Sequence, residues 1–115
     1  MNPAVLDAFA LAIVAGGEPD AYSYLVDRVP GLGAARRDAK AIGDAADKLR
    51  RVAPDGGSYV SEGDYFDAQW QQSFWGPNYR RLLALKKKYD PAGLFFVHHG
   101  VGREAWSADG FTRVD

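Results

Sequence analysis

Glycine and proline interrupt this chain so often that they limit the length of every regular element it can form. Proline fixes its own φ and removes a backbone donor, and glycine often ends helices, so each cluster of these residues closes one element before the next begins. The clusters lie at residues 16–17, 30–33, 54–57, 76–77 and 91–93. With 115 residues divided in this way, we expect residues 1–115 to form a single small unit built from short elements.

The spacing of apolar residues predicts four helices and at least two strands. The clearest helix runs from Ala34 to Val52, where Ile42 and Leu49 lie on one apolar stripe. Asn2 followed by proline is typical of a helix start. The predicted helices cover residues 3–15, 34–52, 67–75 and 79–89, and the predicted strands cover residues 58–61 and 94–97, with one further short strand within residues 21–26. This order predicts an α+β fold, a small helix-rich unit with two or more short strands.

The composition excludes several classes of function. The chain has no cysteine, so it holds no disulfide, thiolate nucleophile or zinc–thiolate cluster of its own. Lys and Arg number 14 against 15 Asp and Glu, so the sequence gives no electrostatic reason to expect a nucleic-acid partner. No apolar run approaches the roughly 20 residues of a membrane span, and no signal peptide is evident. We therefore expect no nucleic-acid or membrane partner and, by default, a cytoplasmic location.

Aromatic residues are concentrated in one short segment. Tyr65, Phe66, Trp70, Phe74 and Trp75 fall within eleven positions, and such a cluster usually forms a core or an interface. A carboxylate, Glu62, lies just before it. Burial among aromatic rings would raise the pKa of this group and make it a proton acceptor near neutral pH, whereas an exposed glutamate after a strand is equally ordinary.

The remaining motifs predict little chemistry by themselves. His98 and His99 are adjacent, and neighbours in a strand point to opposite faces, so we expect one packed and one exposed imidazole and no metal site. Residues 31–33 and 100–102 are Gly-x-Gly fragments without the strand, loop and helix that a phosphate-binding loop needs.

Residues 58–97 carry a longer and more specific pattern. It begins with Tyr59-Val-Ser-Glu62, continues with Trp75-Gly-Pro-Asn78-Tyr, and ends with a lysine-rich helix, Asp-Pro and Leu-Phe-Phe. This pattern resembles the C-terminal segment of berberine bridge enzyme-like oxidases, a branch of the vanillyl-alcohol-oxidase flavoprotein superfamily. In that family the segment reads approximately Tyr-x-Asn-Tyr, aromatic-Gly-x-Asn-(Tyr/Phe), and Lys-x-Lys followed by Asp-Pro. The chain therefore resembles the C-terminal part of a two-domain FAD oxidoreductase.

The resemblance implies a cofactor and three site residues. The cofactor is FAD, bound mainly by an N-terminal FAD-binding domain that we expect to be absent from this chain or separately encoded. In several family oxidases the second Tyr of Tyr-x-Asn-Tyr is the active-site base; Glu62 occupies that position here, and Ser61 replaces the Asn. Tyr59 matches the first Tyr, on the substrate side of the flavin. Asn78 either caps the following helix or hydrogen-bonds the edge of the flavin ring.

The function that follows is that of a substrate- and flavin-facing fragment of an FAD-dependent oxidoreductase. It would oxidise a small alcohol-type substrate, with hydride passing to FAD and then to O2, and we expect it to be inactive by itself. Two other hypotheses stay open. One is a small protein-binding or scaffolding domain without catalysis, since exposed aromatic surface favours association. The other is an independent enzyme using Glu62 with His98 or His99.

Overall fold

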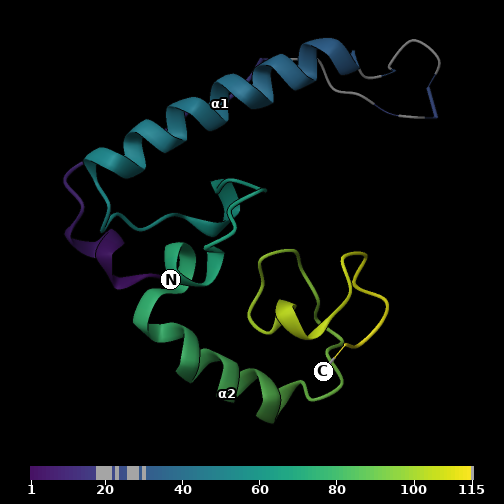
Figure 1. The fold of residues 1–115 in the computed structure, drawn as a ribbon. Coiled ribbons are helices and arrows are strands. Elements are labelled where there is room, and N and C mark those ends of the chain that lie inside the picture. The colour runs from purple at the N-terminus through teal and green to yellow at the C-terminus, as the bar shows by residue number, and fades with distance from the viewer. Residues whose placement is uncertain (18–21, 23, 26–28, 30, 115) are drawn as a thin grey trace. The chain divides into compact units, whose positions relative to one another are not determined.

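The computed structural model of the chain describes residues 1–17, 22, 24, 25, 29 and 31–114. These residues form two compact units, one of Met1–Ala8 with Gly56–Asp115 and one of Phe9–Asp55. Figure 1 labels the two α-helices, one in each unit. The candidate site residues all belong to the first unit. No helix among the described residues is long and apolar enough to cross a membrane.

The predicted α+β class is wrong, because the described residues contain no β-strand. A single isolated bridge joins Trp106 and Arg113. Residues 94–97 do not pair as a strand because the Asp90 carboxylate accepts from the N–H groups of Leu94 and Phe95, at 2.8 and 3.0 Å. The predicted strand at 58–61 instead turns into the 3₁₀ helix Val60–Glu62 (η3). The strand predicted within residues 21–26 lies largely outside the described residues.

Helix α1, Leu32–Val52, is the main element of the unit Phe9–Asp55 and confirms the predicted helix. It follows Gly31, carries Arg50 and Arg51 in its last turn, where positive charge suits the helix dipole, and ends where the Ala53 N–H donates to Leu49 O. None of its residues is buried.

The N-terminal helix is shorter than the predicted 3–15. Asn2 caps it as expected, since its Oδ1 accepts from the N–H of Ala4 at 3.1 Å, but only the 3₁₀ helix Pro3–Asp7 (η1) forms. Ala8 is already extended. Phe9 and Leu11, beyond it, are exposed, so the apolar stripe has nothing to pack against that would prolong the helix.

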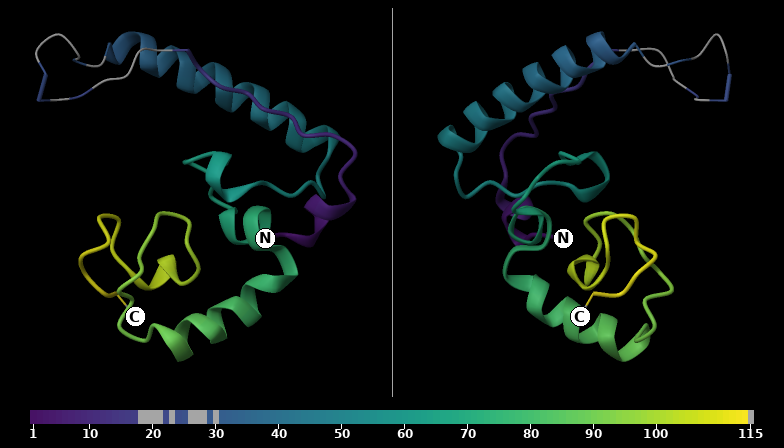
Figure 2. Two further views of the ribbon diagram at one scale, coloured as in Figure 1. Left: turned by 180° about the vertical axis from the view of Figure 1, so that it is seen from behind. Right: turned by 45° about the vertical axis from the view of Figure 1, so that its right-hand side comes forward.

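The core of the first unit is small and lies on the segment predicted as helix 67–75. This segment forms a π-helical turn, Gln71–Trp75 (η4), followed directly by the 3₁₀ helix Gly76–Asn78 (η5). Trp70 and Phe74 are its buried apolar side chains, at 9% and 2% exposure. The Asn2 N–H donates to Phe74 O at 2.6 Å, so the N-terminus is fixed against this turn; both views in Figure 2 show η1 beside it.

Helix α2, Tyr79–Tyr89, has the predicted bounds. At its end, Lys86 pairs with Asp90 and donates to Phe95 O at 2.5 Å, which holds the chain after the helix in a turn. The 3₁₀ helix Arg103–Ala105 (η6) follows. The side chain of Asn78 makes no capping hydrogen bond to α2. The structure therefore lacks the helix cap that was one of the two expectations for Asn78.

Candidate functional site

Tyr59 and Glu62 are brought together by one turn. The Glu62 N–H donates to Tyr59 O at 3.0 Å, and the turn is fixed to the core on both sides. Before it, the Ser58 N–H donates to Ser73 O at 2.8 Å. After it, Gly63 lies so close to the ring of Phe74 that an added Cβ would come within 2.6 Å of Cζ. The two predicted site residues therefore stand on one turn that packs against a buried ring.

Both side chains face outward in this chain. The Glu62 carboxylate is exposed, and Tyr59 is 42% exposed. Neither side chain has a hydrogen-bond partner in the part of the chain that the structure describes. The burial of Glu62 among aromatic rings that the sequence suggested is thus not provided by these residues alone.

Asn78 ends η5, just before α2. Its amide nitrogen donates to Met1 O at 3.1 Å, which fixes the side chain, while its Oδ1 accepts from no described residue. The structure gives no contact between Asn78 and the turn of Tyr59 and Glu62. Asn78 therefore offers one oriented, free acceptor oxygen.

An aromatic cluster surrounds His99, and the sequence did not reveal this arrangement. His98 stacks on Tyr65 with ring centroids 3.9 Å apart, and the two histidine rings also lie 3.9 Å apart. His99 stacks on Trp70 at 5.6 Å and meets Phe74 edge to face at 5.4 Å. His99 is buried at 8% exposure and His98 is exposed, which confirms the expected pair of one packed and one exposed histidine.

The two imidazoles are close because residues 98–99 form a turn and not a strand. Alternation across a strand would have separated them. The turn depends on a positive φ of 59° at His99, a conformation uncommon outside glycine. Two adjacent histidines before Gly-Val-Gly are the sequence signal that could have suggested this turn.

Tyr79 links α2 to η6. Its hydroxyl donates to the Glu104 carboxylate at 2.6 Å and accepts from the Gly102 N–H at 3.2 Å. Burial raises the pKa of Tyr79, and the hydrogen bond to Glu104 raises it further. The ring also packs edge-on against Trp70, at 5.6 Å. Tyr79 thus stays protonated and ties the aromatic cluster to the residues after it.

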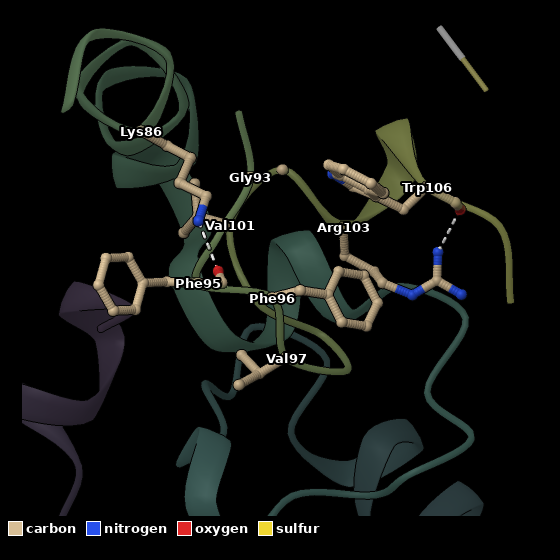
Figure 3. A pocket seen from close by; sticks show the side chains of 9 residues that line it. Lys86, Gly93, Phe95, Phe96, Val97, Val101, Arg103 and Trp106 are labelled. Carbon is tan, nitrogen blue, oxygen red and sulfur yellow. Dashed lines mark hydrogen bonds between the residues drawn. The ribbon is translucent and has the colours of Figure 1, made fainter. Parts of the chain in front are cut away.

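A small cavity lies beside α2, between Lys86 and Arg103 (Figure 3). Its volume of about 10 Å³ is enough for roughly one water molecule. Arg103 lies over the ring of Phe96 and donates to Trp106 O at 2.7 Å, and its Nε is buried without a partner among the described residues. This cavity is too small for a substrate. No cluster of residues with metal-binding potential occurs in the described parts of the chain.

Comparisons with known proteins agree with the pattern at residues 58–97. Residues 58–102 match the family model "Berberine and berberine like". An uncharacterized FAD-linked oxidoreductase of Arthroderma benhamiae is 51% identical over 66 residues, which are 57% of this chain and 11% of the relative. The VAO-type flavoprotein oxidase VAO615 of Thermothelomyces thermophilus is 41% identical over 80 residues, 70% of this chain and 14% of that protein.

A third relative, the FAD-linked oxidoreductase ffsJ of Aspergillus flavipes, is 47% identical over 66 residues, 57% of this chain and 11% of the relative. No solved structure is significantly similar to this chain. The relatives share one class, that of FAD-linked oxidoreductases and flavoprotein oxidases. The match of residues 58–102 to this family model, together with these relatives, confirms the resemblance inferred from the sequence. The chain spans about a tenth of the length of the curated relatives it matches.

Proposed function

We propose that this chain is the C-terminal, substrate-facing part of an FAD-dependent oxidoreductase that oxidises a small alcohol-type substrate. The remaining polypeptide of that enzyme, encoded with this chain or separately, would bind most of the cofactor. The relatives named above support the cofactor, because each is named as FAD-linked or as a flavoprotein.

The observation that carries the proposal is the exposure of apolar residues inside the matched segment. Phe66 and Leu94 are each 80% exposed and Phe95 is 77% exposed, while Trp70 and Phe74 alone form the buried apolar core of the described residues. A self-contained domain rarely leaves large apolar side chains of this kind uncovered together. They are suited to contact with further polypeptide.

The residues fit one part of FAD only. Gly31 and Gly33 lie at the start of α1 with no strand before them in the described residues, so that part of the chain offers no phosphate-binding loop. Asn78 Oδ1 is free to accept from an N–H at the edge of the flavin ring. Asn78 would therefore hold the ring edge, and other polypeptide would hold the rest of the cofactor.

Tyr59 and Glu62 then handle the substrate. FAD, when bound, supplies the two-electron acceptor that takes hydride from the alcohol carbon and passes the electrons to dioxygen. The Glu62 carboxylate accepts the proton of the substrate hydroxyl, and the Tyr59 hydroxyl, which has no partner among the described residues, donates to the substrate oxygen and orients it. Enclosure by the other polypeptide would strengthen both interactions by excluding water.

Glu62→Gln in the complete oxidoreductase tests the proposal. The amide keeps the size of the side chain but does not accept a proton, so we expect the rate of alcohol oxidation to fall by about 10²–10⁴-fold. Asp55→Asn, which changes an exposed carboxylate outside the first unit, is the matched control and should keep the wild-type rate. A Glu62→Gln enzyme that retains the full rate at every pH would contradict the role of Glu62.

The exposed apolar residues also favour a second function, that of a non-catalytic protein-binding domain. Size-exclusion chromatography with thermal unfolding of this chain separates the two. A monomer that unfolds cooperatively would favour the binding domain. Aggregation of the chain would favour a part of a larger enzyme.

A further inference from the structure

The side chain of His99 is held by aromatic rings and makes no hydrogen bond to a described residue. Trp70 covers its face, with planes 17° apart, Phe74 meets it edge-on, and its own carbonyl accepts from Trp75 Nε1 at 3.3 Å. Its two ring nitrogens bond to no other described residue. Among the described residues, Arg103 Nε is the one side-chain atom that is fully buried without a partner. The ring nitrogens of His99 are therefore not fully buried. The nitrogens of a buried ring therefore reach solvent.

The neighbouring His98 differs in this respect. Its Nε2 lies 2.8 Å from Tyr65 O and must donate to that carbonyl, and the ring stacks on Tyr65. Only His99 combines a clamped ring with two nitrogens that bond to no described residue. His99 has a positive φ of 59°. Backbone strain of this kind is concentrated at functional sites.

His99 and the turn that carries Glu62 both pack on the ring of Phe74. Gly63, the residue after Glu62, packs on the ring of Phe74, and the same ring lies 5.4 Å from the ring of His99. Tyr65, two residues further, has its ring 6.3 Å from His99. The ring of Phe74 is thus a common packing contact of the Glu62 turn and of His99.

The surroundings of His99 favour the neutral ring. Burial is the largest effect and lowers the pKa of His99, and His98 lowers it further. Asp67 and Asp64 oppose this in part, and Arg103 adds the smallest lowering effect. The other titratable groups of the cluster are the phenols of Tyr65 and, beyond Trp70, of Tyr79. A neutral imidazole is ready to take up a proton and to release it again.

We propose that His99 is a proton-relay residue for the Glu62 site. The inference rests on the proposed function. After Glu62 takes the proton from the substrate hydroxyl, the lone pair of a His99 ring nitrogen accepts that proton through water: the O–H bond breaks, an N–H bond forms, and no electrons are transferred. His99 then releases the proton to solvent and Glu62 is again a carboxylate.

Chemical rescue in the complete oxidoreductase tests the relay. His99→Asn is suitable because asparagine tolerates a positive φ. In dilute buffer we expect its rate of alcohol oxidation to fall about tenfold or more, and added imidazole to restore it, since a small buffer replaces a lost relay. Asp55→Asn, which changes an exposed side chain outside the first unit, is the control and should keep the wild-type rate. Glu62→Gln should stay slow with imidazole.

A second measurement is independent of activity. An NMR titration of the His99 imidazole in the complete oxidoreductase, assigned by comparison with His99→Asn, should show protonation at a pH below the usual value for histidine. A ring that does not titrate, a His99→Asn rate that stays at the wild-type level in dilute buffer, or a loss that imidazole does not restore would overturn the relay. A wild-type enzyme without oxidase activity would instead overturn the proposed function, and the relay with it.

Discussion

The backbone conformation and the close neighbours of Gly76 exclude any side chain at this position. Its φ is +53°, and an added Cβ would come within 2.7 Å of Asn2 Oδ1. Asn2 in turn donates through Nδ2 to Gln72 O at 2.9 Å and to Ser73 O at 3.1 Å. The absence of a side chain at Gly76 thus lets Asn2 make these hydrogen bonds, which hold the N-terminus on the turn before α2.

We therefore expect Gly76→Ala to lower the free energy of unfolding by about 1–3 kcal/mol, from backbone strain and loss of the Asn2 contacts. Gly43→Ala is the control, because Gly43 lies inside α1 with no atom near an added Cβ. It should raise the stability of the helix by up to about 1 kcal/mol. Urea unfolding followed by circular dichroism measures both. An unchanged Gly76→Ala protein would contradict the account of this turn.

At the scale of elements, the helices were more predictable than the rest. The apolar stripes of α1 and α2 are local patterns, and the predicted bounds of α2, residues 79–89, match the structure. The strands failed because a strand needs a partner that the sequence does not specify, and here side chains of Asp90 and Lys86 take the backbone groups of residues 94 and 95. The region of His99 and Tyr79 depends on contacts between distant residues, which spacing alone does not predict.

The turn after α2 should be sensitive to acid. The hydrogen bond from Lys86, helped by the Leu94 and Phe95 N–H groups, lowers the pKa of Asp90 below its ordinary value of 3.8. The carboxylate therefore stabilises the folded state above that pH, and the stabilisation is lost as the pH falls through the lowered value.

Asp90→Asn should remove this part of the acid dependence and lower the midpoint of thermal unfolding at neutral pH. The control is Asp44→Asn, which breaks a solvent-exposed pair with Lys40 in α1 and should change the midpoint little. Thermal unfolding at neutral and at acid pH, followed by circular dichroism, distinguishes the two variants. Equal effects of Asp90→Asn and Asp44→Asn would contradict the role of Asp90.

At the scale of the molecule, the first unit is built around a core of two large side chains. Trp70 and Phe74 are buried, and His99 and the Glu62 turn pack on them, while residues such as Phe95 stay exposed. Among the described residues this arrangement leaves apolar surface uncovered and offers no phosphate-binding loop. It is consistent with one part of a larger flavoprotein.

The most direct test of that claim is the anaerobic mixing of the complete polypeptide containing this chain with small alcohols, followed by visible absorbance. We predict a flavin spectrum that bleaches when substrate is added, and bleaching about 10²-fold slower or more in Glu62→Gln, because proton abstraction assists hydride transfer. A complete polypeptide that purifies folded but without flavin absorbance would contradict the account.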